Sequence, residues 1–224
     1  MVSLGIMGQS KYMPTQVRVG YDLSSLVNTL ANSDKTFFEV TADIDFDRYF
    51  VTMDYGIQER TRQGDDFLYK NRGSYFRIGP EVNFNHRDRR NSSLFLGFRY
   101  ATAVFDDEMS YMIQDDVFGE FSGFSSNDRL NAEWLELVSG LKVKIWDQLF
   151  LGYTVRFKFA KSQDLSENLA PYDIPGYGRV DQDTAWGFNY YVFYRFKLRE
   201  IPDVPERKER KKKNKKEVED LDQS

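Results

Sequence analysis

The sequence predicts an all-β protein, an eight-stranded antiparallel up-and-down transmembrane β-barrel, from three observations. Apolar and polar residues alternate with period 2 over eight segments, most strictly from Trp186 to Leu198. The chain is 16% aromatic, yet its mean hydropathy is polar at −0.61. Short and long connections alternate along the chain, as in outer-membrane barrels. No run of about 18 apolar residues occurs, so no transmembrane helix is expected.

The first four segments each carry an apolar face at every second position, which predicts strands over 16–24, 37–46, 49–58 and 74–84. These faces are Val17, Val19, Tyr21 and Leu23; Phe38, Val40, Ala42, Ile44 and Phe46; Tyr49, Val51, Met53, Tyr55 and Ile57; and Phe76, Ile78, Pro80, Val82 and Phe84. Pro80 lacks a backbone donor, which predicts a bulge or the end of regular pairing in the fourth strand.

The last four segments repeat the pattern and predict strands over 93–105, 134–145, 149–159 and 186–198. Their apolar faces are Leu94, Leu96, Phe98, Tyr100 and Val104; Leu135, Leu137, Leu141, Val143 and Ile145; Leu149, Leu151, Tyr153, Val155, Phe157 and Phe159; and Trp186, Phe188, Tyr190, Val192, Tyr194, Phe196 and Leu198. Each segment has about 9–13 residues, and a tilted membrane strand needs roughly 9–11.

The connections assign the two rims of this barrel. Short turns are expected at 47–48, 85–92 and 146–148, and longer loops at 25–36, 59–73, 106–133 and 160–183. Short turns face the periplasm in such barrels and long loops face the outside. The sequence therefore predicts the outer membrane of a Gram-negative cell, with extracellular long loops and periplasmic termini.

Glycines indicate which face is inside. Glycine weakens a strand unless a neighbour must approach closely, and a narrow lumen requires such approach. Seven strands carry a glycine on the polar face: Gly20, Gly56, Gly79, Gly97, Gly140, Gly152 and Gly187. We therefore expect the polar face to line the lumen.

The same face carries charges of both signs, which predicts ion pairing across a lumen filled by side chains. The predicted network is Arg18, Asp22, Glu39, Asp43, Asp54, Arg77, Glu81, Arg99, Glu136, Lys142, Arg156, Lys158 and Arg195. Aromatic residues near the ends of the apolar face fit two interfacial girdles in contact with lipid. These residues are Phe46, Tyr49, Phe84, Tyr100, Phe159, Trp186 and Phe196.

Two alternatives stay open. A soluble lipocalin-like barrel also alternates but places the apolar face around a lipid cavity. An outer-membrane enzyme acting on lipid or peptide needs catalytic groups at the long-loop rim, whereas the single histidine, His86, lies in a predicted short turn. No catalytic residue, metal site or cofactor is predicted. The absence of cysteine excludes disulfides and thiol chemistry.

Two regions are candidates for partner contacts, although the two acidic loops can instead pack on each other as a cap. The segments 105–128 and 169–183 are acidic and aromatic, and the tail 201–224 joins a basic run to an acidic run. Outer-membrane lipid is the expected partner, an envelope protein is a candidate partner through the acidic loops or the basic tail, and nucleic acid is not expected. We expect three regions: a segment 1–14, the barrel over 15–200 and a charged, disordered periplasmic tail over 201–224. Residues 1–14 are either the remnant of a signal peptide or an ordinary start.

Six motifs carry a family resemblance: "VRVGYDLSSL" (17–26), "SYFRIGPEVNF" (74–84), "FLGFRYATAVF" (95–105), "EWLELVSGLKVKIWDQLFLGYTVRFK" (133–158), "DIPGYGR" (173–179) and "GFNYYVFYRF" (187–196). They resemble a Bacteroidota family known as a domain of unknown function and regarded as outer-membrane barrels. The resemblance implies the barrel fold but no activity and no catalytic residues. The sequence thus favours a non-catalytic envelope component that is structural or binds a partner, including a subunit of a secretion or assembly complex.

Overall fold

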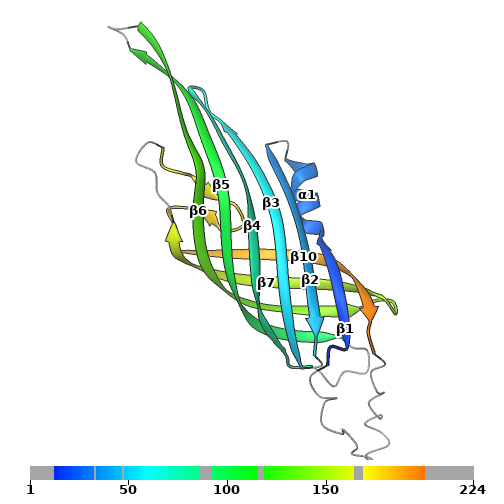
Figure 1. The fold of residues 1–224 in the computed structure, drawn as a ribbon. Helices are drawn as coiled ribbons and strands as arrows, with labels where there is room; N and C mark the ends of the chain where they lie inside the picture. Colours follow the sequence, from blue (N-terminus) through cyan, green and yellow to red (C-terminus); the bar gives the residue numbers. More distant parts are fainter. Residues whose placement is uncertain are drawn as a thin grey trace, which may run out of the picture.

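Eight antiparallel strands close into a barrel in the computed structural model, which describes residues 13–32, 34–46, 48–85, 92–115, 119–163 and 169–199 (Figure 1). Around the ring the order is β1, β10, β7, β6, β5, β4, β3 and β2. Each strand pairs with its sequence neighbour, and β1 pairs with β10 to close the ring. The predicted eight-stranded up-and-down barrel is confirmed.

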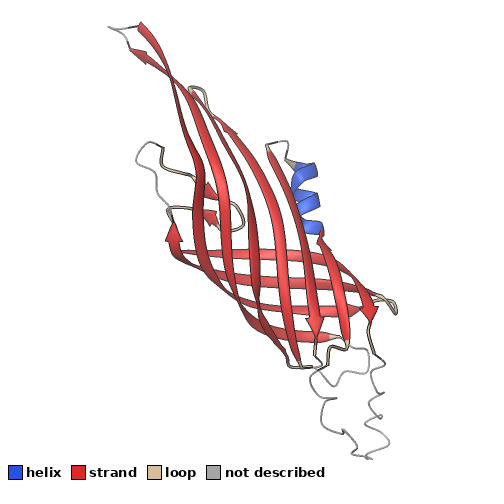
Figure 2. Cartoon of the chain, in the orientation of Figure 1, coloured by secondary structure: helices blue, strands red, loops and turns tan. Residues whose placement is uncertain are grey.

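The strands differ greatly in length, from the 7 residues of β1 to the 26 of β6. Their bounds are β1 Gln16–Asp22, β2 Lys35–Asp45, β3 Tyr49–Gln63, β4 Phe67–Asn83, β5 Ser93–Asp115, β6 Gly119–Lys144, β7 Leu149–Gln163 and β10 Thr184–Lys197. Two short strands, β8 Asp173–Ile174 and β9 Gly178–Arg179, form a separate hairpin. The helix α1, Leu23–Ala31, stands beside the barrel wall (Figure 2).

The helix α1 lies where the sequence predicted the end of a strand and a long loop. The side chain of Asp22 accepts a hydrogen bond from the backbone of Ser24 at 3.0 Å, so Asp22 caps the first turn. Apolar side chains then follow at positions 23, 26, 27 and 30, a helical spacing. The prediction of a loop over 25–36 is wrong because this helix has only 9 residues, which leaves little periodicity to detect.

Two other predicted loops are mostly strand. The segments 59–73 and 106–133 continue β3, β4, β5 and β6 as hairpins above the apolar part of the barrel. Near the barrel their inner faces bury polar side chains such as Asn71, Asp107 and Asn127, and farther up both faces are exposed, so no apolar period marks these strands. In the predicted loop 160–183, β7 continues to Gln163, and the hairpin β8–β9 lies farther along the chain.

Pro80 interrupts pairing without shifting it. It pairs with Val51 of β3, but the β4–β5 ladder has no pair between Ile78 and Glu81. The register is the same on both sides of this gap, so neither a bulge nor the end of the strand occurs. His86, the segment 1–12 and the tail 201–224 lie outside the described residues.

Candidate functional site

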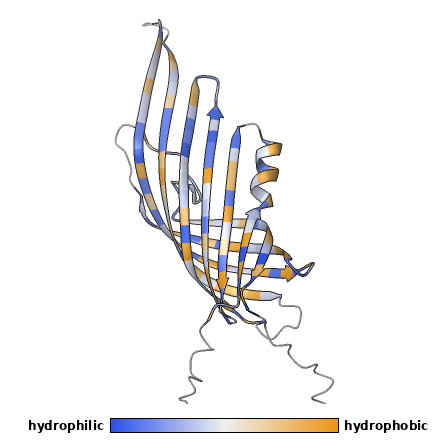
Figure 3. Ribbon diagram, turned by 45° about the vertical axis from the view of Figure 1, so that its right-hand side comes forward, coloured by the Kyte–Doolittle hydropathy of each residue, from blue (hydrophilic) through white to orange (hydrophobic). Residues whose placement is uncertain are grey.

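The barrel is apolar outside and charged inside. Figure 3 shows apolar and polar residues alternating along the strands. Outward side chains such as Phe98 (64% exposed) and Leu151 (45%) are apolar, whereas inward side chains such as Arg18 and Glu81 (both 0%) are charged. A transmembrane barrel has this distribution, and a lipid-carrying soluble barrel has the reverse. The lipocalin-like alternative is therefore wrong.

The apolar belt has a defined upper limit. On four strands the next outward residue above the belt is charged, namely Glu59, Asp106, Glu133 and Lys161, and on β4 Ser74 lies between the belt and Arg72. Two pairs join across neighbouring strands, Glu59 to Arg72 at 2.9 Å and Glu133 to Lys161 at 2.8 Å. From Tyr49 to Ile57, β3 rises about 20 Å at ~3.3 Å per residue and ~40° of tilt. The belt thus approaches the roughly 25 Å apolar band of membrane barrels.

The aromatic residues predicted at the girdles face outward. Phe46 is partly buried, and the other six are exposed by 39–64%, namely Tyr49, Phe84, Tyr100, Phe159, Trp186 and Phe196. Trp186 packs against Phe157 with ring centroids 4.6 Å apart. The polar groups of Tyr49, Tyr100 and Trp186 favour the boundary between lipid and water.

All thirteen charged residues of the predicted network lie in the lumen, each exposed by 8% or less. They are Arg18, Asp22, Glu39, Asp43, Asp54, Arg77, Glu81, Arg99, Glu136, Lys142, Arg156, Lys158 and Arg195. A charge in a space this dry costs several kcal/mol unless it is paired and hydrogen-bonded. The pairing pattern therefore decides what the lumen can do.

The centre of the lumen is a cluster of three arginines and four carboxylates. Arg156 contacts Asp54 and Glu136, each at 3.1 Å. Arg77 binds Glu39 at 3.0 Å, and Arg99 binds Asp54 and Glu81. These residues come from strands all around the ring, so their contacts cross the lumen and close it.

A second cluster lies closer to the short-turn rim. Lys142 binds Asp43 at 2.8 Å and Glu81 at 3.1 Å, and Arg18 binds Asp43 at 2.8 Å. The guanidinium of Arg18 also stacks over Phe50, 4.6 Å from the ring centroid. Glu81 links the two clusters, so the lumen is filled continuously between them.

The seven predicted glycines accommodate these large neighbours. A Cβ on Gly56 would overlap the ring of Tyr75, and one on Gly79 would overlap the carbonyl oxygen of Phe98. Six are buried and one is partly buried: Gly20, Gly56, Gly79, Gly97, Gly140, Gly152 and Gly187.

Aromatic side chains complete the network, and two of them were not predicted. The hydroxyl of Tyr75 donates to Glu39 at 2.5 Å, and the indole of Trp134 donates to Glu136 at 2.8 Å. Tyr191, which the alternation did place inside, also donates to Glu39. Tyr75 and Trp134 lie at lumen-facing positions, so the register alone would have identified them. Glu39 is thereby saturated with donors and is not a free general base.

The hairpin β8–β9 covers the lumen at the long-strand rim. The ammonium of Lys158 donates to the carbonyl oxygens of Gly176 at 2.7 Å and Tyr177 at 3.0 Å. Asp173 pairs with Arg60, and its carbonyl accepts from the amide of Asn71 at 3.1 Å. Burial raises the pKa of the Asp173 carboxyl, while Arg60 opposes that shift. The hairpin is thus attached to the wall by buried polar contacts.

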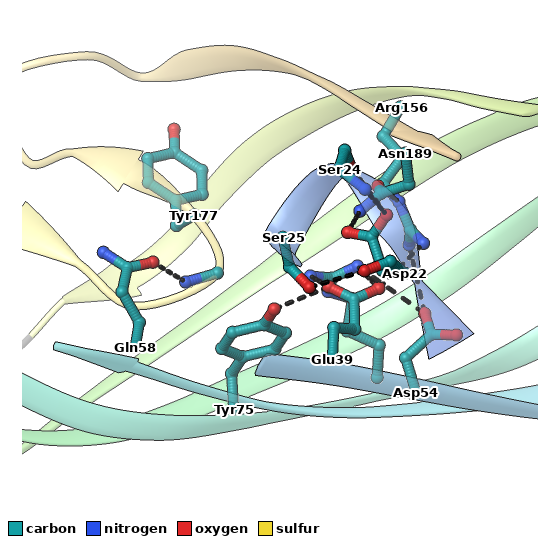
Figure 4. Close-up of polar contacts among 12 residues, drawn as sticks. Asp22, Ser24, Ser25, Glu39, Asp54, Gln58, Tyr75, Arg156, Tyr177 and Asn189 are labelled. Atoms are coloured by element: carbon teal, nitrogen blue, oxygen red, sulfur yellow. Dashed lines mark hydrogen bonds and ion pairs between the residues drawn. The ribbon is translucent and has the colours of Figure 1, made fainter. Parts of the chain in front are cut away.

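A polar cavity of about 230 Å3 remains between this hairpin and α1 (Figure 4). The strands β2 and β10 supply its side walls, and the central cluster supplies its floor. Its charged lining residues are Asp22, Glu39, Arg60, Arg77, Lys158 and Asp173. Within the described residues no group of three potential metal-ligating side chains occurs, and no helix there is long and apolar enough to cross a membrane.

The β5–β6 hairpin rises far above the belt. From Asp106 to Asp115, β5 gains about 30 Å at ~3.3 Å per residue. A bulge between Phe105 and Asp107 redirects it, where Arg129 adopts φ 56° and donates its backbone N–H to Asp106 at 2.6 Å. Burial raises the pKa of Asp107 at the hairpin base, while hydrogen bonds from Asn127 and Tyr69 oppose that shift.

Comparison with known proteins places the chain in a family but gives no activity. Residues 6–200 match the family model described as "Domain of unknown function (DUF6048)". The search of the curated proteins found no match.

Several solved barrels show a distant likeness. The N-terminal β-barrel domain of Pseudomonas aeruginosa OprF is 10% identical, with 82% of this chain and 98% of that chain covered and a TM-score of 0.41. Ail, the attachment invasion locus protein of Yersinia pestis, is 11% identical over 82% and 100%, with a TM-score of 0.41. Neisserial surface protein A is 11% identical over 82% and 96%, with a TM-score of 0.38. Likeness at this level carries no functional argument.

Proposed function

The chain belongs to the DUF6048 family, and we propose that it is a non-catalytic, non-conducting outer-membrane barrel that presents its β5–β6 hairpin to an envelope protein partner. The hairpin carries the proposal. Its two strands exceed the length that a membrane strand needs by more than any other strand of the barrel, since β5 has 23 residues and β6 has 26. A barrel built only to sit in lipid has no need of such an extension.

The hairpin has an edge that another strand can pair with. Pairing of β6 with β7 begins at Ala132, so in the described chain residues 119–131 of β6 pair only with β5. An unpaired strand edge is a template for strand addition by a partner. The proposed partner therefore adds a strand beside β6.

Apolar side chains near the tip supply contact area on both faces of the hairpin. Ile113 pairs with Phe121 on one face, whereas Met112 and Phe124 lie on the other, and all four are exposed by 48–64%. Their surroundings are acidic, with Asp106, Asp107, Glu108, Glu120 and Asp128 along the same hairpin. These features support a partner whose contact surface is basic and apolar.

The filled lumen supports a role other than transport. An eight-stranded barrel is only wide enough for its own side chains, and here ion pairs link opposite walls. We expect no large stable conductance in planar bilayers. The β5–β6 hairpin lies at one rim of the barrel. The first and last strands begin and end at the other rim, the short-turn rim, where Gln16 pairs with Lys197. An outer-membrane orientation with the hairpin outside and the termini in the periplasm follows from the proposal.

Three finer predictions belong to the same proposal. The source is a Gram-negative bacterium, and the family resemblance points to the Bacteroidota. The basic part of the tail, outside the described residues, is a second contact for anionic lipid or a periplasmic protein. The partner complex acts in secretion or envelope assembly.

Site-specific photo-crosslinking in native membranes tests the proposal. A benzophenone amino acid replaces Phe124 in one variant and Trp146, a turn residue at the opposite rim and 69% exposed, in the control. We expect one discrete protein adduct from Phe124 and none of the same mass from Trp146. The adduct should disappear when Phe121 and Ile113 are both changed to serine. No adduct at Phe124, or an equal adduct at Trp146, would contradict partner binding by the hairpin.

A further inference from the structure

The barrel wall contains a seam between β2 and β10. The pairing of β1 ends at Tyr21 with β2 and at Asp22 with β10, because the chain then enters α1. Residues 35–39 of β2 and 184–190 of β10 extend beyond this point and pair only with β3 and β7. The upper part of the wall therefore lacks one strand, and α1 occupies its place (Figures 1 and 2).

Side chains close this seam in place of a backbone ladder. Thr29 of α1 accepts a hydrogen bond from the backbone N–H of Phe37 at 2.8 Å and donates to its carbonyl at 3.2 Å. On the other side Asp22 accepts from the side chain of Asn189 at 2.7 Å and from the backbone N–H of Tyr190 at 3.2 Å. Each such bond contributes about 0.5–1.5 kcal/mol, and a few bonds open far more easily than a paired strand.

The outer face of α1 continues the lipid-facing surface. Leu23, Leu26, Val27 and Leu30 follow the i, i+3, i+4, i+7 spacing and are exposed by 37–78%. On the wall at the two sides of the seam, Phe188 and Tyr190 of β10 and Phe38 of β2 are also exposed. Acyl chains that contact the belt therefore reach the helix without crossing a polar boundary.

The inner face of α1 borders the polar cavity. Ser25, which is 5% exposed, lines the cavity together with Asp22, Glu39 and Asn189 (Figure 4). The charged lining residues comprise three carboxylates and three cations, so the lining has no net formal charge. An ionic head group would leave an uncompensated charge in this space, whereas a neutral or zwitterionic one would not.

We propose that this seam is a lateral route from the membrane, and that the cavity binds the polar head group of a lipid without net charge. The acyl chains stay outside against the stripe of α1. The volume of about 230 Å3 is below the roughly 300–1,000 Å3 of pockets that hold a drug-sized molecule, so it suits a head group rather than a whole lipid. The site is independent of the β5–β6 hairpin and of any protein partner.

Cysteine labelling tests the route, because the chain has no native cysteine. Ser25→Cys places a thiol on the cavity side of α1, and Thr52→Cys is the control, since Thr52 is buried in the lumen at 1% exposure and does not line the cavity. Both folded variants are placed in phosphatidylcholine vesicles with either a diacylglycerol that carries a maleimide head group or a water-soluble sulfonated maleimide.

We expect the lipid reagent to label Ser25→Cys at least about tenfold faster than it labels Thr52→Cys. We also expect the lipid reagent to label Ser25→Cys faster than the water-soluble reagent labels the same variant. Equal labelling of the two cysteines by the lipid reagent, or none, overturns the lateral route. Labelling of Ser25→Cys by the water-soluble reagent alone also overturns it, since access then comes from the aqueous mouth.

Native mass spectrometry tests the head group on the unmodified chain. The protein is titrated in detergent with phosphatidylethanolamine, which is zwitterionic, or phosphatidylglycerol, which is anionic. We expect at least about fivefold greater retention of phosphatidylethanolamine, and loss of this preference in Ser25→Trp, where the indole fills the cavity. Equal retention of both lipids, or an unchanged preference in a folded Ser25→Trp protein, overturns the site.

Discussion

Replacing Asp54 by asparagine tests whether the lumen is held by its ion pairs. The Asp54 carboxylate contacts Arg156 at 3.1 Å, Arg77 at 3.6 Å and Arg99, and its side chain is fully buried. Asparagine keeps the shape but removes the charge. The three guanidinium groups then share one counter-ion fewer in a space that excludes water.

The expected cost follows from breaking a buried ion pair, which destabilises a protein by about 3–5 kcal/mol. Each arginine retains another partner, such as Glu81 for Arg99 and Glu136 for Arg156, so the cost is one uncompensated charge rather than three. Removing Arg99 as well, in Asp54→Asn with Arg99→Met, restores the balance while Glu81 keeps Lys142. We expect this double variant to be more stable than Asp54→Asn alone.

The assay is reversible unfolding by urea in lipid vesicles, followed by heat-modifiable gel mobility. With a slope of about 2 kcal/mol per molar urea, Asp54→Asn should lower the midpoint by about 1.5–2.5 M. Glu133→Gln is the control, because its pair with Lys161 is exposed and is worth about 0–1 kcal/mol. An Asp54→Asn midpoint equal to that of Glu133→Gln, or a double variant less stable than Asp54→Asn, would refute the reasoning.

Three further predictions concern other parts of the structure. Gly79→Ala should block folding because its Cβ overlaps backbone, whereas Gly187→Ala should fold, since the only close neighbour of its Cβ is the flexible end of the Lys158 side chain; equal gel-shift yields would contradict this. Lys158→Met should expose residues 172–180 to protease while Lys161→Met does not, and equal cleavage would show that Lys158 does not hold the β8–β9 hairpin. The raised folded-state pKa of Asp107 stabilises the fold below its ordinary value of 3.8, and this contribution is lost as the pH rises through the raised value. The wild type should therefore lose stability relative to Asp107→Asn between pH 3 and pH 6 in urea titrations, and a constant difference would refute the assignment.

The membrane made part of this structure predictable from sequence. Lipid on one side and a charged lumen on the other impose period 2, so the eight strands and the inward direction of Arg156 and Glu39 followed from alternation. The ion-pair partners of these residues could not be predicted from alternation. The pairing of Arg156 with Asp54, for example, depends on the shear of the barrel and on the reach of the side chains across the lumen.

Other elements lacked a detectable pattern. In the extension of β5 and β6 beyond Asp106, the buried inward residues Asp107 and Asn127 are polar and both faces are exposed nearer the tip, so the sequence resembled a loop. The helix α1 has a cap at Asp22 and four apolar positions at helical spacing. Because it is so short, the sequence pattern assigned its residues to the end of a strand and to the loop that follows. The hairpin β8–β9 depends on distant anchors such as Lys158, which local sequence does not reveal.

Quenching of tryptophan fluorescence by brominated lipid tests the central claim, that the apolar face contacts lipid and the charged face lines a closed lumen. Trp186 faces outward at 64% exposure and Trp134 faces the lumen at 1%. One variant keeps only Trp186 and the other only Trp134, with the remaining tryptophans, including Trp146, changed to phenylalanine. We predict strong quenching of Trp186 and little quenching of Trp134 when the acyl chains carry bromine. Stronger quenching of Trp134 than of Trp186 would show that the faces are reversed and would contradict the account.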